Sequence, residues 1–479
     1  METKSTHWTS CPECQGRAKK SKGISKKARE TYQVAIDTFE KSNKKGPVPI
    51  APKGNLYSCS NCNGTGLIPT LNIPTPDTKN YPTIAIIGGG IGGIALAIAC
   101  MQRAIPFTLY ERDNNFEARS QGYGLTLQQA TKAIQALGIF DLKEGVISTK
   151  HLVHTTDGQV IGEWGNRKWM QRDQKKEAKR TNIHIARQSL RLALLEQLGG
   201  QEAVKWGHQL IAIKPSNNKE LNLQFEVNGQ DQFAKADLIV GADGIRSTVR
   251  KLVIGDYKTP LRYLDCIVIL GICTLQSIKN VDRTLLDSAT VFQTANGNER
   301  IYIMPYDSNS VMWQLSFPML EDEAKALSAL GPQALKDEAS RRTLWHDPIP
   351  QIIAATQATQ ISGYPVYDRE LLKPNLLENI GPITLIGDAA HPMSPFKGQG
   401  ANQALLDAVK LAREITKMTK PDSPWREKGI RETILKQFEA DMLERTAVKV
   451  KDSAAAAQFL HTKMVLHEAN QPRRNIDLD

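Results

Sequence analysis

Short apolar stretches alternate with helical ones in the part of the chain that begins near residue 83. Residues 83–87 form a run of apolar, mostly β-branched side chains, which predicts a buried strand of a parallel sheet. Residues 94–102 are apolar and rich in good helix formers, so we expect a helix there. Residues 106–110 predict a second strand. This order of strand, helix and strand is typical of an α/β unit.

The pattern changes in the middle of the chain and changes back towards its end. Residues 258–370 are richer in strand-like segments, notably 266–273 and 290–318, and they contain no nucleotide-binding motif. The α/β pattern returns from residue 382, and residues 426–465 have a helical pattern. We therefore expect a sheet-rich segment inserted into an α/β domain, followed by C-terminal helices.

The first predicted strand runs directly into a glycine motif, Gly88-x-Gly90-x-x-Gly93. In such a motif the first glycine permits a tight turn, the second lets the backbone approach a pyrophosphate, and the third lets helix and strand pack closely. The helix N-terminus that follows offers unpaired N–H groups to phosphate oxygens. Glu111 ends the second strand, 18 residues after Gly93, where a ribose-binding carboxylate is expected. Together these features predict a Rossmann-like dinucleotide site.

Composition narrows the class of protein. The 479 residues suffice for two or three domains, and 41% hydrophobic residues with a mean hydropathy of −0.36 are ordinary for a soluble globular protein. The sequence contains no apolar run of the ~18 residues that a membrane span needs. The chain starts with polar and basic residues rather than an apolar signal core, so we expect a cytoplasmic protein.

The net charge of +11 is unevenly distributed. Residues 1–80 hold 13 basic and 6 acidic side chains, and a second basic cluster lies at 167–180. Basic patches can attract nucleic acid or acidic proteins, but such clusters are more often a solvated surface. We favour the solvated surface and do not expect a nucleic-acid partner, while residues 1–80 stay a candidate surface for a protein partner.

Four cysteines near the start of the chain form two C-x-x-C pairs separated by 44 residues: Cys11 with Cys14, and Cys59 with Cys62. Four thiolates in this arrangement suit tetrahedral Zn²⁺, and a helix predicted at 26–41 can return the chain between the pairs. The short stretches around the pairs resemble the zinc region of J-domain chaperones. We expect a structural zinc site, with a redox dithiol pair and unligated thiols as the alternatives. Three further cysteines lie in apolar sequence and are expected to be buried: Cys100, Cys266 and Cys273.

From Glu111 onwards the chain resembles the flavin-dependent aromatic hydroxylases, the para-hydroxybenzoate hydroxylase-like single-component monooxygenases. The resemblance covers roughly residues 82–460. It rests on motifs in the family's order: the glycine fingerprint; Gly-Tyr-Gly-Leu-Thr-Leu at 122–127; Arg-Gln-Ser-Leu-Arg-Leu-Ala-Leu-Leu at 187–195; the Asp-Gly motif within 237–250; Gly-Asp-Ala-Ala-His-Pro at 387–392; and Pro-Phe-Lys-Gly-Gln-Gly-Ala-Asn at 395–402. The resemblance implies FAD as the cofactor and NAD(P)H as a co-substrate.

The resemblance also implies which residues lie at the FAD. They are Gly88, Gly90, Gly93, Glu111, Arg112, Arg187 at the pyrophosphate, Asp243, Gly387, Asp388, Pro395, Gly398, Gly400, Ala401 and Asn402. The residues themselves agree with this placement. Asp388 follows a predicted strand at 383–386, where its carboxylate can accept hydrogen bonds from ribitol hydroxyls. A helix predicted at 401–412 can direct its N–H groups at the flavin N1–C2=O edge and stabilise the anionic reduced flavin.

Several of these residues have structural alternatives. Asp388 could be a helix N-cap, Asp243 a turn residue and Arg187 a surface residue of its helix. His391 is a candidate proton donor near the flavin or a structural partner of backbone groups. Lys397 replaces the small residue that the family has before Gly398, so it is either a solvated charge or a contact to substrate or nicotinamide. His391 and Lys397 are the two candidate catalytic residues.

The resemblance implies a mechanism. NAD(P)H reduces FAD, and O₂ adds to the reduced flavin at C4a. The resulting hydroperoxide transfers one oxygen to an electron-rich aromatic or polyketide-like molecule, and the other oxygen leaves as water. Two alternatives stay open: a flavin-dependent reductase without oxygen insertion, and a flavin-bearing protein that acts through its zinc module. The sequence has no match to the tryptophan-rich motif of flavin halogenases.

The expected fold is α/β: a Rossmann-like FAD-binding domain with an inserted mixed β-sheet substrate domain, C-terminal helices and a small N-terminal zinc module. The predicted division is 1–66 for the cysteine-rich module, 67–81 for a proline-rich linker, 82–257 and 371–425 for the two parts of the FAD-binding domain, 258–370 for the substrate sheet and 426–479 for the helical region. Within the sheet, Tyr302, Met304, Trp313 and Leu315 alternate and are expected either to line the substrate pocket or to be core.

Overall fold

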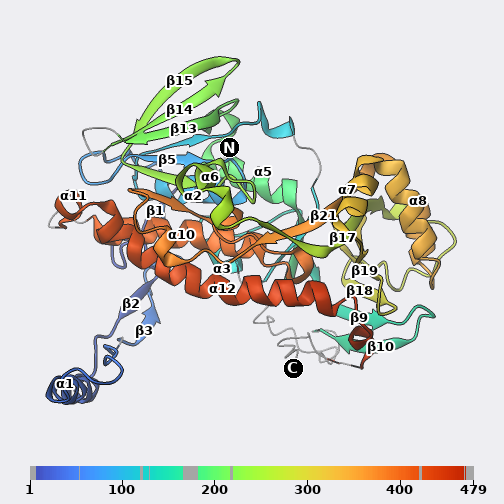
Figure 1. The fold of residues 1–479 in the computed structure, drawn as a ribbon, viewed down its shortest axis with the longest axis horizontal. Helices are drawn as coiled ribbons and strands as arrows, with labels where there is room; N and C mark the ends of the chain where they lie inside the picture. The colour runs from blue at the N-terminus through green and yellow to red at the C-terminus, as the bar shows by residue number, and fades with distance from the viewer. Residues whose placement is uncertain are drawn as a thin grey trace. The chain divides into compact units, whose positions relative to one another are not determined.

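The computed structural model describes residues 7–52, 54–118, 122–128, 130–165, 182–215, 220–419, 423–468 and 470. The chain separates into two compact units. The smaller unit is Met1–Pro76 with Met101–Ala104, and the larger is Asp77–Cys100 with Ile105–Asp479 (Figure 1). The basic cluster predicted at 167–180 lies outside the described residues.

A five-stranded parallel sheet carries the dinucleotide motifs of the larger unit. Its strand order is β12 (Val204–Lys205), β6 (Phe107–Tyr110), β5 (Ile84–Ile87), β16 (Leu238–Gly241) and β22 (Ile383–Leu385). Helix α2 (Ile91–Met101) crosses from β5 to β6, as the pattern of the sequence predicts. Every residue of β5 and β16 is buried, which explains why these strands are continuous apolar runs.

A seven-stranded mixed sheet forms the second layer of the larger unit. Its strand order is β10 (Val160–Trp164), β9 (Lys150–His154), β18 (Thr290–Ala295), β19 (Arg300–Pro305), β20 (Ser310–Pro318), β17 (Leu261–Thr274) and β21 (Ile361–Arg369). Strands β9 and β18 pair in parallel and the other neighbours are antiparallel, so the mixed sheet that we expected is confirmed. It also recruits β9 and β10, which lie outside the predicted boundary of 258–370.

The two faces of this sheet have different roles. Tyr302 of β19 pairs with Gln314 of β20, so even-numbered residues of the two strands share one face. That face lines a cavity, whereas Trp313 and Leu315 point to the opposite side. There they belong to a fully buried core beneath α7 (Glu321–Ala329), α8 (Pro332–Arg342) and α9 (Ile349–Ala355). For Trp313 and Leu315 the structure therefore favours the core alternative, whereas Tyr302 and Met304 line the cavity.

Smaller elements complete the larger unit. The other strands form two three-stranded sheets: β7 (Gly124–Leu127), β11 (Asn182–Ala186) and β8 (Val146–Ser148); and β13 (Gln209–Pro215), β14 (Leu221–Val227) and β15 (Gln230–Ala236). The other helices among the described residues are α3 (Thr131–Gln135), α5 (Arg187–Leu198), α6 (Thr248–Val253), α10 (Gly400–Met418), α11 (Trp425–Lys428) and α12 (Lys436–Phe459), and a π-helical turn, η9 (Arg431–Leu435), precedes α12. The 3₁₀ turns are η1 (Phe116–Ala118), η2 (Gln201–Ala203), η3 (Asp256–Lys258), η4 (Leu275–Ser277), η5 (Ala358–Gln360), η6 (Pro374–Leu376), η7 (Gly387–Ala389), η8 (Pro395–Lys397) and η10 (Lys463–Leu466).

The described residues of the smaller unit form two short two-stranded antiparallel sheets and one helix. Strand β1 (His7–Ser10) pairs with β4 (Leu67–Thr70), and β2 (Lys19–Ser21) pairs with β3 (Leu56–Ser58). Helix α1 spans Lys26–Lys41, the predicted range, and the Ser25 hydroxyl caps it by accepting a hydrogen bond from the Ala28 N–H at 3.2 Å. Because β4 pairs with β1, the first residues of the predicted linker at 67–81 are strand.

None of the helices in the described part of the chain combines the length and the apolar character that a bilayer crossing requires.

Candidate functional site

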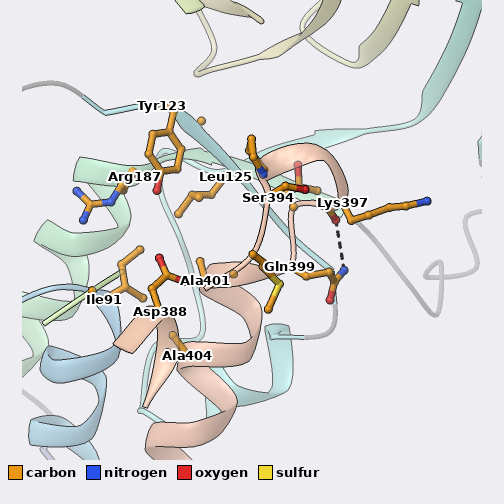
Figure 2. Close-up of a pocket in the computed structure, with 18 of the residues that line it drawn as sticks. Ile91, Tyr123, Leu125, Arg187, Asp388, Ser394, Lys397, Gln399, Ala401 and Ala404 are labelled. Carbon is orange, nitrogen blue, oxygen red and sulfur yellow. Dashed lines mark hydrogen bonds between the residues drawn. The ribbon is translucent and has the colours of Figure 1, made fainter. Parts of the chain in front are cut away.

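A large cavity of about 1060 Å³ lies within the larger unit. One end is lined by the glycine loop after β5, the end of β6 and the start of α5. The other end is lined by the seven-stranded sheet and by the C-terminal half of α12. Figure 2 shows Tyr123, Arg187 and Asp388 gathered around one region of this space, with Lys397 on a loop to one side.

The three fingerprint glycines are required for different reasons. Gly88 has a φ of +112°, and a Cβ there would lie 2.5 Å from the Ala242 carbonyl oxygen. A Cβ on Gly93 would lie 1.9 Å from the Gly88 carbonyl oxygen, so contact within the protein accounts for both residues. A Cβ on Gly90 would meet no atom within 4 Å, although Gly90 lines the cavity. The missing side chain at Gly90 therefore leaves room for a bound group and is not needed to avoid a clash with other protein atoms.

Glu111 lies beside this loop at the end of β6. Its Oε2 accepts a hydrogen bond from the Gly89 N–H at 2.6 Å, and its Oε1 accepts one from the Asp113 N–H at 3.0 Å. Each carboxylate oxygen keeps a second lone pair for a ribose hydroxyl. The neighbouring Arg112 also lines the cavity, with 58% of its side chain exposed and its Nε 3.9 Å from a carboxylate oxygen of Asp113.

Two arginines of α5 face the same end of the cavity. Arg187, a predicted contact, lies over the Tyr123 ring at 5.9 Å. Sequence reasoning missed Arg191, whose Nε donates to the Gly89 carbonyl at 2.9 Å and whose Nη1 donates to the Phe116 carbonyl at 3.2 Å. The two arginines are four residues apart and so share a helix face, which is the signal that would have indicated Arg191.

Asp243 lies just before helix α6, whose N-cap is Ser247, and it also lines the cavity. Its carboxylate accepts hydrogen bonds from the Ser247 hydroxyl and from the Val249 N–H at 3.1 Å, and burial raises its pKa. The same motif contains Arg250, another residue that sequence reasoning missed. Its Nη1 donates to the carbonyls of Ala389 and Ala390 at 2.9 and 3.0 Å. Arg250 thereby holds two motifs together that are about 140 residues apart in the chain.

Asp388 faces the cavity and its side chain is exposed to that space. Burial deep in the molecule raises the pKa of its carboxyl group, and the charges of His391 and Arg187 partly oppose this rise. Gly387 before it has a φ of +58°, and a Cβ there would lie 3.1 Å from that of Ala404 in α10. The turn therefore requires glycine so that the strand end and the helix can lie close together.

His391 does not line the cavity. Its Nε2 lies 2.6 Å from the Asp407 carboxylate, which also accepts the Gly387 N–H at 3.0 Å and a hydrogen bond from Arg445. The geometry thus favours the structural alternative for His391, although its partner is a carboxylate rather than a backbone group, and its catalytic role stays a prediction.

The loop at 395–402 leads from the cavity into α10, and Pro395, Gly398, Gly400 and Ala401 line the cavity. Gly398 has a φ of +58°. Asn402 is fully buried and outside the lining: its Oδ1 accepts from the Gln128 N–H at 2.9 Å and its Nδ2 donates to the carbonyls of Thr126 and Gly398, each at 2.8 Å. Asn402 therefore positions the loop rather than facing a ligand.

Lys397 lines the cavity, and burial lowers the pKa of its ammonium group, with the nearby Asp452 opposing this shift. Two histidines also line this part of the space. Burial lowers the pKa of His184 to about 3 and that of His151 to about 4. Both are therefore neutral at pH 7. His184 bonds the hydroxyls of Ser148 and Thr126, at 2.7 and 3.1 Å, which fixes its ring.

The four N-terminal cysteines come together in the smaller unit. Their Sγ atoms all lie within 4.8 Å of one another and all four residues are buried. The Asn61 side-chain amide donates to the Cys11 sulfur at 3.3 Å and the Gly66 N–H donates to the Cys62 sulfur at 3.2 Å. N–H groups directed at sulfur stabilise thiolates, so this donor set fits a metal ion with four sulfur ligands.

The cavity fits a dinucleotide cofactor. Gly90 leaves an open approach for phosphates at the N-terminus of α2, and α2 presents its positive dipole end there. Arg187 and Arg191 add positive charge at this end, and Asp388 presents a carboxylate to the interior. The 19-residue helix α10 begins at Gly400, which lines the cavity, so the N-terminus of a second helix also faces this space.

Comparison with known proteins agrees with this geometry. Residues 81–425, more than two thirds of the chain, match the family model described as FAD binding domain. The FAD-dependent monooxygenase thnD of Trichoderma harzianum is 24% identical over 393 residues, covering 77% of this chain and 91% of that protein. The aurachin C monooxygenase/isomerase of Stigmatella aurantiaca is 28% identical over 337 residues, covering 70% and 81%.

A solved structure shares the fold. Klebsiella pneumoniae HpxO, complexed with FAD and uric acid, is 21% identical and superposes with a TM-score of 0.65 over 80% of this chain and 90% of that chain. The motifs, the cavity that they line and the family match agree with one another. The chain therefore belongs to the FAD binding domain family and is an FAD-dependent enzyme of the aromatic hydroxylase-like monooxygenases.

Proposed function

We propose that this enzyme uses NAD(P)H and O₂ to hydroxylate an aromatic or polyketide-like small molecule. The observation that carries the proposal is the continuity of the cavity. The glycine loop and Asp388 line one end, and the aromatic and apolar face of the seven-stranded sheet lines the other. A redox cofactor at the first end and an electron-rich molecule at the second would therefore share one continuous cavity.

FAD would lie along the motif residues. The open backbone at Gly90 and the arginines of α5 would hold its phosphates, Glu111 would hold the ribose, and Asp388 would hold ribitol hydroxyls. The N–H groups at the start of α10 would face the flavin ring and favour its anionic reduced form. When bound, FAD supplies the activation of O₂ and the transfer of one oxygen atom to an electron-rich carbon.

The chain itself orients the reactants and excludes water. Asn402 holds the loop before α10 through its bonds to Thr126 and Gly398, which fixes the wall against which a flavin ring would lie. The sheet offers Tyr302, Met304 and other apolar side chains, which favour a planar, conjugated ligand. Such positioning and desolvation are the main contributions that a protein makes in cofactor chemistry.

Relatives point to similar chemistry. Two of them are the FAD-dependent monooxygenase thnD and the aurachin C monooxygenase/isomerase. We assign the glycine fingerprint to FAD, so NAD(P)H would deliver its hydride without a separate Rossmann-like domain of its own. No cysteine of the described structure forms a disulfide, which fits a reducing compartment, and we infer a cytoplasmic location.

The test is a substrate panel with the purified, FAD-loaded protein. NADH or NADPH oxidation and O₂ uptake are measured with phenols, heteroaromatic compounds and polyketides, and products are identified by mass spectrometry. The proposal predicts stimulated oxidation and a product heavier by one oxygen. Stoichiometric reduction of a substrate without O₂ uptake would contradict it and support the reductase alternative.

The cysteine cluster carries a second proposal, a structural Zn²⁺ bound by Cys11, Cys14, Cys59 and Cys62. The mutual Sγ separations and the N–H groups directed at sulfur support it. Helix α1 of the same unit has no buried residue, and Val34 on it is 64% exposed. Residues 1–80 therefore stay a candidate surface for a protein partner. Binding of a partner that weakens with added salt and is lost when residues 1–80 are deleted would identify it.

A further inference from the structure

The smaller unit contains a short segment from the FAD-binding part of the chain. Besides the cysteine-rich module (1–66) it includes Met101–Ala104, which complete helix α2 and form the turn after it. Helix α2 is continuous from Ile91 to Met101, so it begins in the larger unit and its last residue belongs to the smaller one. One helix therefore leads from the dinucleotide fingerprint to the residues that pack with the cysteine-rich module.

Two residues of this turn are hydrogen-bonded by the cysteine-rich module. The Ser10 N–H and the Ser10 hydroxyl both donate to the Gln102 carbonyl, at 3.0 and 3.4 Å. The Arg103 Nη2 donates to the Gly16 carbonyl at 3.3 Å. All four residues belong to the smaller unit, and Gln102 and Arg103 are only 1% and 3% exposed. Because glutamine and arginine are rarely buried so completely, the turn is packed as closely as a protein core.

The partners of the turn flank two of the proposed zinc ligands. Ser10 directly precedes Cys11, and Gly16 lies two residues after Cys14. The Gly16 N–H donates to the Cys11 carbonyl at 3.2 Å, which closes a compact loop. A Cβ on Gly16 would lie 3.2 Å from the Ser10 Oγ and 3.3 Å from the Arg103 Nε, so this loop and the guanidinium are in direct contact. A metal ion that fixes the two cysteines would also fix the groups that hold the turn.

The turn lies between two parts of the proposed FAD site. Helix α2 begins at the glycine loop with its positive dipole end and its unpaired N–H groups, and the chain after the turn enters β6, which leads to Glu111. The last four carbonyls of a helix have no partner within it, so an unsupported helix end frays. Because α2 has only 11 residues, loss of order at its C-terminal end would also loosen its first turn and the start of β6.

We propose that the cysteine-rich module is a clasp on the end of α2, so that Zn²⁺ bound by its four cysteines strengthens FAD binding at the start of the same helix. The proposal rests on the proposed FAD and zinc sites and assigns control of the first to the second. Small modules held by a metal and four cysteines unfold without the metal, so loss of zinc would release the turn from Ser10 and Gly16. Arg103 acts on FAD through α2 and is therefore a positioning residue.

Such a coupling is reciprocal. If zinc raises the affinity for FAD by some factor, FAD must raise the affinity for zinc by the same factor. Couplings between two sites are typically about 5- to 150-fold, and we expect a factor of roughly five or more. A zinc site that only stabilises its own module would change the resistance of that module to unfolding and leave the affinity for FAD unchanged.

The test uses the full-length protein from which FAD has been removed. Metal analysis first establishes whether each chain holds one zinc. Flavin fluorescence titration then measures the affinity for FAD in the zinc-loaded protein and in protein freed of zinc by a chelator. Competition with a chromophoric chelator measures the affinity for zinc with and without saturating FAD. We expect the zinc-free protein to bind FAD roughly fivefold or more weakly, and FAD to raise the affinity for zinc by the same factor.

Variants assign the coupling to the turn. Arg103→Met keeps the apolar stem of the side chain and removes the donor to Gly16, so the zinc-loaded variant should bind FAD more weakly than the wild type and depend less on zinc. Arg103→Lys should restore part of both properties, because its ammonium group is still a donor. Arg29→Met is the matched control, since Arg29 is an exposed arginine of α1 in the same unit, and it should behave as the wild type. These comparisons need no zinc removal, so a zinc-free protein that fails to fold does not prevent the test.

The outcomes separate this proposal from those on which it rests. One zinc per chain with equal FAD affinity in its presence and absence would overturn the clasp and leave the zinc site standing. Wild-type FAD affinity and full zinc dependence in Arg103→Met would also overturn the clasp. Weaker FAD binding without the reciprocal gain in zinc affinity would count against it, because damage on zinc removal would then be the cause. Purified protein that binds no zinc would overturn the zinc site and the clasp together, while substrate-stimulated O₂ uptake would show that the monooxygenase function stands.

Discussion

Substitutions of the fingerprint glycines give the sharpest test, because the structure explains the need for glycine differently at Gly90 and at Gly93. In Gly90→Ala the added methyl group meets no protein atom within 4 Å, and Gly90 is absent from the positive-φ positions of the described backbone. The variant without cofactor should fold as well as the wild type. It should gain about 0.4–1 kcal/mol, because alanine reduces the conformational entropy of the unfolded chain. The same methyl group intrudes on the space through which the backbone approaches the FAD pyrophosphate.

Gly90→Ala should weaken FAD binding without destabilising the apoprotein. Losing one or two charge-assisted hydrogen bonds costs about 1.5–3 kcal/mol, which weakens FAD binding roughly 10- to 100-fold. Flavin fluorescence titration of the apoprotein measures the affinity, and denaturant unfolding of the apoprotein measures its stability. The control is Gly93→Ala, whose Cβ would lie 1.9 Å from the Gly88 carbonyl oxygen. It should destabilise the fold itself by about 1–3 kcal/mol or more. Wild-type FAD affinity in Gly90→Ala would refute the reasoning.

Other predictions follow from buried groups. Burial raises the pKa of the Asp407 carboxyl group, but His391 and Arg445 more than offset this effect and lower the pKa in the folded state. The charged carboxylate therefore stabilises the fold at pH values above the ordinary carboxyl pKa, and this stabilisation is lost as the pH falls through the folded-state pKa. Asp407→Asn should lower the free energy of unfolding by about 3 kcal/mol or more near neutral pH, and an unchanged denaturation midpoint would contradict this. Burial lowers the pKa of His184 to about 3, so on acidification the histidine of the unfolded chain takes up a proton before that of the folded protein does. His184 should therefore lower the free energy of unfolding by about 1.4 kcal/mol for each pH unit below pH ~6.5. His184→Asn should flatten that slope, and an identical slope would count against a neutral buried histidine. Cys59→Ser should abolish stoichiometric zinc in metal analysis of the purified protein, and Cys273→Ser, a buried cysteine outside the cluster, should retain it.

Local patterns account for the parts of the fold that the sequence predicted well. The strand and helix around the fingerprint were predictable because β5 is buried on both faces and α2 starts at a glycine turn. Helix α1 spans its predicted range because Ser25 caps its start and good helix formers follow. These signals act within a few residues, and one sequence contains them in full.

Long-range pairing accounts for what sequence reasoning missed. Strand β9 joins the substrate sheet by pairing with β18, which lies 140 residues later in the chain. Arg250 contacts carbonyls about 140 residues away, and nothing near it in the sequence indicates them. His391 binds Asp407, and only the packing of η7 against α10 brings the two together.

The central claim is that the cavity joins a bound FAD to an organic substrate for oxygen insertion. The most direct measurement is turnover of the FAD-loaded enzyme with NAD(P)H under isotopically heavy O₂, with a substrate found in the panel and mass analysis of the product. The account predicts a product that carries one heavy oxygen atom, with the second recovered in water. A product whose added oxygen comes from water, or a reduced product formed equally well without O₂, would contradict it.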